Sequence, residues 1–294
     1  SAHYDHLGLG WPDARPGAQG RIHPGADDNA SGVSALLALA ETFGRGALPR
    51  GLIFAAFTGE EAGRLGSKRF VKENAGSPLR VVAMVNLDTV GRLGGRRLVA
   101  LGTGSAREWS RLVEEAGNAA GQPAAAVAED PGGSDQVSFA EAGIPAVQLF
   151  AGPHEDYHRP SDTPEKLDYP GLSRIAALTR ELLGRLASGP GLTPTGSGAI
   201  GKDPRAARKV SLGAIPDFSF GGEGTRLSGV TAGSPAEKAG LRAGDVIVAL
   251  GGMPVKSLKD FSNRLKEFRP GERVAVGYLR DGRREEASAT LEAR

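Results

Sequence analysis

Apolar residues in the first two thirds of the chain follow two alternating patterns. Some segments repeat an apolar residue every three or four positions, which predicts helices, and these segments span residues 30–43, 106–120 and 172–186. Others are short continuous apolar runs typical of buried strands, and these span residues 51–58, 79–87, 97–101 and 146–150. Strands that alternate with helices indicate an α/β fold, with a mainly parallel sheet and helices on both of its faces.

The pattern changes after a segment of linker composition. Residues 188–205 are rich in Gly, Pro, Ser and Thr and contain almost nothing apolar. Beyond them, short apolar pieces stand between glycine turns, which predicts strands, at 210–212, 227–230, 246–250, 274–279 and 287–291. Two short helices are expected among them, at 235–239 and 258–268. We therefore expect a first domain over residues 1–187, and a small, mostly β domain over residues 206–294.

Composition excludes several classes of function. The net charge of +2, from 36 basic and 34 acidic residues, gives no reason to expect nucleic acid as a partner. No apolar run is long enough to predict a membrane span. The chain has no cysteine, so disulfides and thiolate zinc sites are excluded, and any metal must take imidazole and carboxylate ligands.

Candidate chemistry is concentrated where predicted strands end or a helix starts. Five segments carry it: His3-Tyr4-Asp5, Gly25-Ala26-Asp27-Asp28-Asn29, Glu60-Glu61, Asp88 and Tyr157-His158. In open α/β sheets the strand ends face a crevice, where such groups would converge. Acids and imidazoles that converge there predict a site for two divalent metals and metal-assisted hydrolysis. Helix capping alone would account for the Asp27-Asp28 pair, and a lone histidine is more often structural.

The adjacent carboxylates of Glu60 and Glu61 are the sharpest element. Two desolvated carboxylates repel each other unless a cation lies beside them. One could bind a metal while its neighbour handles the proton of an activated water. Both could instead simply begin the helix expected after Gly63.

Taken in order, these motifs resemble the co-catalytic zinc aminopeptidases of the secreted bacterial type. Their wider family includes glutamate carboxypeptidases and glutaminyl cyclases. The resemblance covers residues 1–187, and further matching segments are Gly66-Ser67, Ser134-Asp135 and Gly143-Ile144-Pro145-Ala146. It implies a zinc exopeptidase fold, two Zn²⁺ ions and a peptide substrate. It also suggests a periplasmic or secreted location, although no signal peptide is visible.

The resemblance also implies roles for individual residues. Asp27 would bridge the two zinc ions, with Glu61 and His158 completing one site and His3 and Asp88 the other. Glu60 would be the general base, and Tyr157 would stabilise the oxyanion. Asp5 and Asp162 would orient the two imidazoles, His3 and His158.

The chain departs from the family at its start. Members carry further strands before the first histidine motif, whereas only Ser1 and Ala2 precede His3 here. We therefore expect a fragment or a processed form, in which N-terminal strands are missing and one zinc site is loose or empty.

The second domain resembles the PDZ domains attached to bacterial proteases. The matching stretch runs from Gly233 to Ile247 and contains Ser-Pro-Ala-Glu-Lys-Ala-Gly-Leu. PDZ domains take an extended peptide as an added strand and hold its terminal carboxylate with loop amides. By resemblance, the candidate loop is Leu212-Gly213-Ala214-Ile215. The alternative is an ordinary strand with a blocked groove.

Together these predictions favour a zinc-dependent aminopeptidase with a C-terminal PDZ domain. Three alternatives stay open. A carboxypeptidase would need a cationic subsite, for which Arg159 is a candidate; a cyclase would use one zinc ion; and a non-catalytic scaffold would bind peptides without metal.

Overall fold

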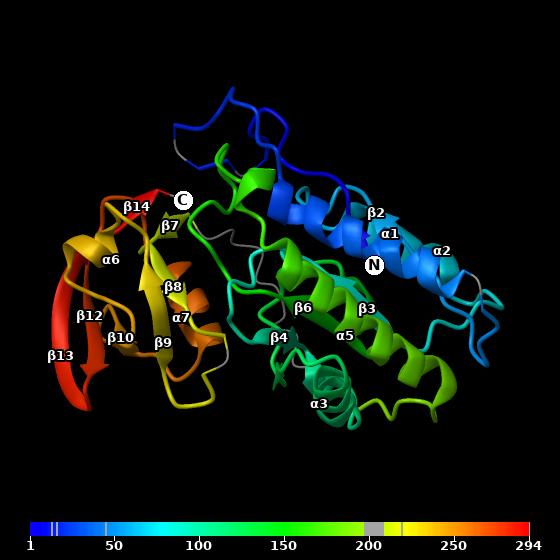
Figure 1. The fold of residues 1–294 in the computed structure, drawn as a ribbon. Coiled ribbons are helices and arrows are strands. Elements are labelled where there is room, and N and C mark those ends of the chain that lie inside the picture. Colours follow the sequence, from blue (N-terminus) through cyan, green and yellow to red (C-terminus); the bar gives the residue numbers. More distant parts are fainter. Residues whose placement is uncertain (13, 16, 45, 197–208, 219, 294) are drawn as a thin grey trace. The chain divides into compact units, whose positions relative to one another are not determined.

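The computed structural model describes residues 1–294 except 13, 16, 45, 197–208, 219 and 294. The chain divides into two compact units, one of residues 1–152 and 156–200 and the other of 153–155 and 201–294 (Figure 1). Part of the predicted linker, residues 197–205, and the predicted start of the second domain at 206 lie outside the described residues.

The sheet of the first unit is mixed but mostly parallel. Four strands lie in the order β3-β6-β4-β5, and their bounds are Met84–Leu87, Ala146–Phe150, Leu98–Leu101 and Ala124–Val127. The pairs β3–β6 and β4–β5 are parallel, whereas β4–β6 is antiparallel. A further parallel pair joins β1 (Ala2–His3) to β2 (Ala56–Phe57). Ser1 connects this pair to β3, because its carbonyl accepts the Leu87 N–H.

Helices cover both faces of this sheet, as the sequence predicts. One apolar core joins the strands to α1 (Gly32–Phe43), α3 (Trp109–Ala119) and α5 (Tyr169–Ser188). A smaller core lies with α2 (Leu65–Asn74) and α4 (Gln136–Glu141). Figure 1 shows α1 and α5 running side by side. Short helical turns complete the unit: η1 (Ala26–Ser31), η2 (Thr103–Ser105) and η3 (Pro164–Lys166).

Several predicted elements differ in extent. The apolar runs at 51–58 and 79–87 form strands only at Ala56–Phe57 and Met84–Leu87. Ile53, Leu79 and Val82 are exposed, so these runs are not buried along their whole length. Strand β5 and helix α4 were not predicted, because β5 is an alanine-rich run and α4 is only six residues long.

The second unit is a small, mostly β domain. Its main sheet has the order β13-β12-β10-β9-β8, with bounds Arg283–Thr290, Arg273–Arg280, Val246–Leu250, Thr225–Val230 and Ala214–Pro216. Strand β11 (Met253–Pro254) pairs with β10, and β14 (Glu292–Ala293) pairs with β7 (Val210–Ser211). Two short helices are α6 (Pro235–Lys238) and α7 (Leu258–Leu265).

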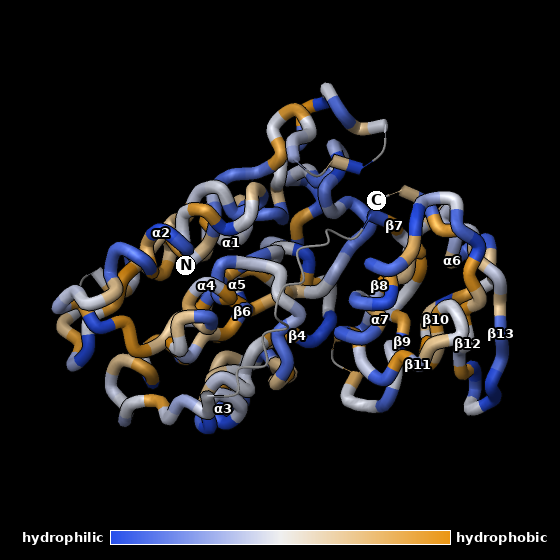
Figure 2. The backbone as a smooth tube through the Cα atoms, turned by 180° about the vertical axis from the view of Figure 1, so that it is seen from behind, coloured by the Kyte–Doolittle hydropathy of each residue, from blue (hydrophilic) through white to orange (hydrophobic). Residues whose placement is uncertain are grey.

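Side-chain alternation and capping explain this second unit. In β12, Val274, Val276 and Tyr278 are buried in one core, whereas most residues of β13 are exposed. Figure 2 accordingly shows β13 as largely hydrophilic. Ser234 and Ser257 cap the two helices by accepting backbone N–H groups. Among all helices of the described residues, we find none with the length and apolar character needed to cross a membrane.

Candidate metal centre

The candidate residues meet at the carboxyl ends of the parallel strands. His3 is the last residue of β1, the Glu60-Glu61 pair follows β2 and Asp88 follows β3. The start of α1 reaches the same edge, because a Cβ on Gly32 would lie 2.5 Å from the carbonyl oxygen of Leu87. Parallel strands open toward one crevice at this edge, which explains why residues distant in sequence meet here.

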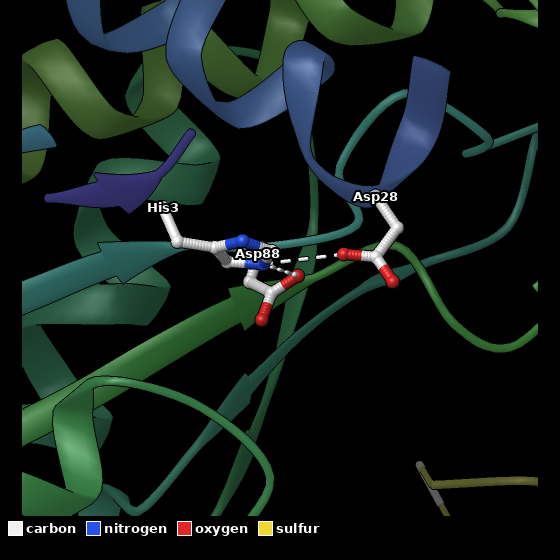
Figure 3. Close-up of side chains that lie close together, drawn as sticks. All are labelled: His3, Asp28 and Asp88. Atoms are coloured by element: carbon white, nitrogen blue, oxygen red, sulfur yellow. Dashed lines mark ion pairs between the residues drawn. The ribbon is translucent and has the colours of Figure 1, made fainter. Parts of the chain in front are cut away.

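His3 lies against two carboxylates, as Figure 3 shows. Its Nε2 atom is 3.2 Å from Oδ1 of Asp28 and 3.6 Å from Oδ1 of Asp88. Its Nδ1 atom lies 3.0 Å from the backbone carbonyl of Asp5. The His3 side chain is 1% exposed, so the two-residue strand β1 is enough to bury and orient it.

The second oxygen of Asp28 faces a second group of donors. Oδ2 lies 3.2 Å from Nε2 of His158, and this nitrogen is also 3.2 Å from Oε2 of Glu61. His6 joins the group, with Nδ1 2.9 Å from Oε1 of Glu61 and 3.9 Å from Oδ2 of Asp28. Asp28 therefore turns one oxygen toward each of two donor clusters.

The shared position is held by Asp28 and not by Asp27, for which the resemblance predicted it. Asp27 is fully buried, and its Oδ1 accepts hydrogen bonds from the Gly91 N–H at 2.5 Å and from the Ser31 hydroxyl at 3.0 Å. The chain leaves helical geometry at Asp28 and Asn29, which separates the directions of the two neighbouring carboxylates. Asn29 then anchors the segment, because its side-chain amide donates to the carbonyl of Leu87.

Asp5 and Asp162 hold backbone that carries the candidate ligands. The Asp5 carboxylate accepts the N–H groups of Glu60 and Glu61, and its contact with Nδ1 of His3 is longer, at 3.7 Å. Asp162 accepts the N–H groups of Asp27 and Asp28 at 3.0–3.1 Å. Each carboxylate therefore holds the backbone of two neighbouring acidic residues at the centre.

Burial and like charges perturb the titration of this centre. Burial by itself would lower the pKa of the His3 imidazole, but the carboxylates of Asp88 and Asp28 outweigh it and raise that pKa. Burial opposes the charge of Asp28, but hydrogen bonds from His158 and His3 hold its carboxyl pKa below the usual range.

The surroundings favour the charged forms of His3 and Asp28, but they favour the neutral forms of Glu60 and Tyr157. Burial, reinforced by nearby carboxylates, raises the pKa of Glu60 well above its usual value. Burial beside the same acids also raises the pKa of the Tyr157 hydroxyl, so that it stays a neutral donor. The Tyr157 ring stacks on that of His158, with 3.9 Å between ring centroids. A buried centre with this excess of carboxylates is suited to cations.

The donor atoms fit zinc in type and in spacing. Two groups, His3–Asp28–Asp88 and His6–Asp28–Glu61, each offer ligand atoms within 4.8 Å of one another. Tetrahedral ligands about 2.0–2.1 Å from zinc would be roughly 3.3 Å apart, which is close to the 3.2 and 3.6 Å around His3. His6 lies just after the predicted His3-Tyr4-Asp5 segment and was not predicted as a site residue; its position three residues after His3 was the available signal.

The predicted loop of the second unit lies at the start of β8. Leu212 is buried, and Gly213 has a φ of +73°, a conformation that favours glycine. Strand β8, which contains Ala214 and Ile215, is the last strand of its sheet among the described residues. An edge strand of this kind presents backbone groups to which a peptide could add.

Comparisons with known proteins agree for each part of the chain. Residues 1–183 match peptidase family M28, and residues 198–291 match the PDZ domain. BSAP, a zinc aminopeptidase from Bacillus subtilis, is structurally similar, with a TM-score of 0.52 and 26% identity over 64% of this chain and 45% of that one. An aminopeptidase from Aneurinibacillus sp. strain AM-1 gives a TM-score of 0.51 and 29% identity, over 61% and 42% of the two chains.

Curated relatives match over shorter segments. The periplasmic pH-dependent serine endoprotease DegQ of Escherichia coli is 39% identical over 69 residues, which are 24% of this chain and 15% of DegQ. The chain thus spans less than half of the two solved structures and a small part of DegQ.

Proposed function

Because the chain belongs to peptidase family M28 and carries a PDZ domain, we propose that it is a zinc-dependent aminopeptidase, which removes N-terminal residues from peptides. The observation that carries this proposal is the orientation of Asp28. Its two oxygens each lie 3.2 Å from a different imidazole, His3 on one side and His158 on the other. One carboxylate between two donor clusters is the arrangement that a pair of neighbouring cations requires.

In this proposal two zinc ions would share Asp28. His3 and Asp88 would hold one ion, and Glu61 and His158 would hold the other. Bound zinc would acidify a water molecule and polarise the carbonyl of the scissile bond. Asp5 and Asp162 keep the ligands in position through the backbone bonds described above.

Glu60 is the proposed general base. Its raised pKa means that the carboxyl readily holds a proton, which it would take from the attacking water and deliver to the leaving amine. The neutral hydroxyl of Tyr157 would donate a hydrogen bond to the oxyanion of the tetrahedral intermediate. The negative charge of Glu60 and Asp88 would attract the free α-amine of the substrate.

The PDZ domain is the proposed site for a peptide C-terminus. The peptide would add to β8, the last strand of its sheet among the described residues, and the loop Leu212-Gly213-Ala214-Ile215 would hold its carboxylate. We propose a periplasmic or secreted location, in line with the name of DegQ.

Metal analysis combined with a substrate panel tests this proposal on the full chain. We expect about two zinc ions per chain, hydrolysis of aminoacyl anilides with a free amine, and loss of hydrolysis with a chelator. N-acetylated anilides should be resistant. Release of C-terminal residues from N-acetylated peptides would establish a carboxypeptidase instead. One zinc ion with cyclisation of N-terminal glutamine would establish a cyclase, and absence of zinc would favour a scaffold.

A further inference from the structure

His6 is a largely buried histidine that the proposed ligand set does not use. It follows the His3-Tyr4-Asp5 motif, and its side chain is only 9% exposed. Nδ1 lies 2.9 Å from Oε1 of Glu61. Nε2 is buried and has no hydrogen-bond partner among the described residues. Within the described part of the chain, the one hydrogen bond of this ring is therefore that to Glu61, and its contact with Asp28 is longer, at 3.9 Å.

Chemistry fixes the direction of that bond. A carboxylate that binds a cation is ionised and can only accept hydrogen bonds, so in the proposed centre Nδ1 of His6 would carry the hydrogen and donate it to Oε1. The other oxygen of Glu61, Oε2, then faces Nε2 of His158 at 3.2 Å. Oε1 of Glu61 is therefore held by His6, and Oε2 faces His158 at the candidate metal centre.

We propose that His6 is a positioning residue. It holds Glu61 so that Oε2 faces the zinc ion that Glu61, His158 and Asp28 would bind together. This inference rests on the proposed function. Direct binding of the metal by His6 fits the distances less well. The 2.9 Å contact has the length of a hydrogen bond, whereas zinc ligands would be about 3.3 Å apart. Nδ1 is also 3.9 Å from Oδ2 of Asp28, while His158 is 3.2 Å from both acids.

The fold makes room for the His6 ring at this position. A Cβ on Gly25 would lie 2.6 Å from Cγ and 2.7 Å from Cδ2 of His6, so only glycine permits this approach. Gly25 also has a φ of +65°, which glycine adopts readily. On another side, His6 meets the His158 ring nearly edge-on, with 5.8 Å between centroids. Packing against Gly25 and His158 therefore helps the hydrogen bond to fix the orientation of the His6 ring.

Two substitutions separate hydrogen bonding from metal ligation. His6→Ala removes the donor, whereas His6→Asn keeps an N–H near the place of Nδ1 and removes the imidazole. Groups that orient metal ligands typically contribute 10–100-fold to metal affinity. We expect His6→Ala to lower the affinity for one of the two zinc ions by this factor. We expect His6→Asn to bind that ion with an affinity within a few-fold of wild type.

The readouts are zinc dissociation constants from competition with a chromophoric chelator, and the absorption spectrum of the cobalt-substituted protein. The cobalt spectrum of His6→Asn should match that of wild type. The matched control is His23→Ala, since the His23 ring lies 6.4 Å from that of His6 and its Nδ1 contacts the carbonyl of Arg21 instead. This variant should bind both zinc ions as wild type does.

Three results would overturn the inference or its basis. If His6→Asn binds zinc as weakly as His6→Ala and its cobalt spectrum changes, His6 is itself a ligand. If Glu61→Ala loses one zinc ion while His6→Ala keeps full affinity, only the inference about His6 fails. If Glu61→Ala keeps both ions at wild-type affinity, both the proposed metal centre and the inference about His6 are wrong.

Discussion

Neighbouring substitutions of Asp27 and Asp28 should have opposite consequences. Asp28→Asn replaces a carboxylate with two charged oxygens by an amide with one neutral oxygen. Since Oδ1 and Oδ2 of Asp28 face different imidazoles, the two zinc ions could no longer share the side chain. We expect zinc content to fall from two ions to one or none, with loss of hydrolysis.

Asp27→Asn should retain both ions. The amide keeps an Oδ1 acceptor for the Gly91 N–H and the Ser31 hydroxyl, which are the hydrogen bonds of Asp27 described above. Asp27→Ala, by contrast, would leave the Gly91 N–H without its acceptor, whereas the Ser31 hydroxyl could still donate to the backbone carbonyl of residue 27 at 2.7 Å. An unsatisfied buried group costs about 1–3 kcal/mol, so Asp27→Ala should lower the free energy of unfolding by about that amount. That loss is appreciable against a typical stability of about 5–15 kcal/mol.

The assays are elemental analysis after dialysis against metal-free buffer, aminoacyl-anilide hydrolysis, and urea unfolding monitored by circular dichroism. Zinc content, hydrolysis and stability are thus measured on the same samples. Two zinc ions retained by Asp28→Asn, or both ions lost from a folded Asp27→Asn protein, would refute the assignment of the shared position to Asp28.

Three further predictions concern other groups. Glu60→Gln should keep two zinc ions but slow hydrolysis by about 10²–10⁴-fold, since the base is lost; near-normal turnover would contradict the assignment. Burial raises the pKa of Asp135 to about 6, so its ionisation should destabilise the metal-free fold as pH rises from about 4 to above 6. Asp135→Asn should remove that dependence and gain up to about 3 kcal/mol at pH 8; urea titrations at pH 4 and pH 8 test this, and equal pH slopes in both proteins would contradict it. Gly213→Ala should abolish binding of a fluorescent C-terminal peptide but spare anilide hydrolysis, because a Cβ there overlaps that of Ser234; unchanged peptide binding would contradict it.

Local patterns predicted the elements whose apolar residues pack along their whole length. Residues 146–150 form strand β6 as expected, and residues 172–186 lie within α5, where Ile175, Leu178 and Leu182 are buried. The apolar run at 51–58 was misleading, because only its last part pairs with β1. Apolar composition does not by itself tell how much of a run finds a partner strand.

The candidate site was also predictable only in part. The motif order predicted where acids and imidazoles would gather, and His3, Glu61, Asp88 and His158 do lie around one carboxylate. Which of two adjacent aspartates holds the shared position could not be predicted, because it depends on a local departure from helical backbone at Asp28.

For this protein, residue types and their spacing determined the α/β class, the second β domain and the type of ligand available to a metal. Only the tertiary structure decided which oxygen atoms face which nitrogen atoms. Asp28, and not Asp27, lies between the two imidazoles, and His6 contacts Glu61. The physical reason is that spacing along a chain sets the neighbourhood of a side chain, whereas backbone torsions and close packing at Gly25 and Gly32 set its direction.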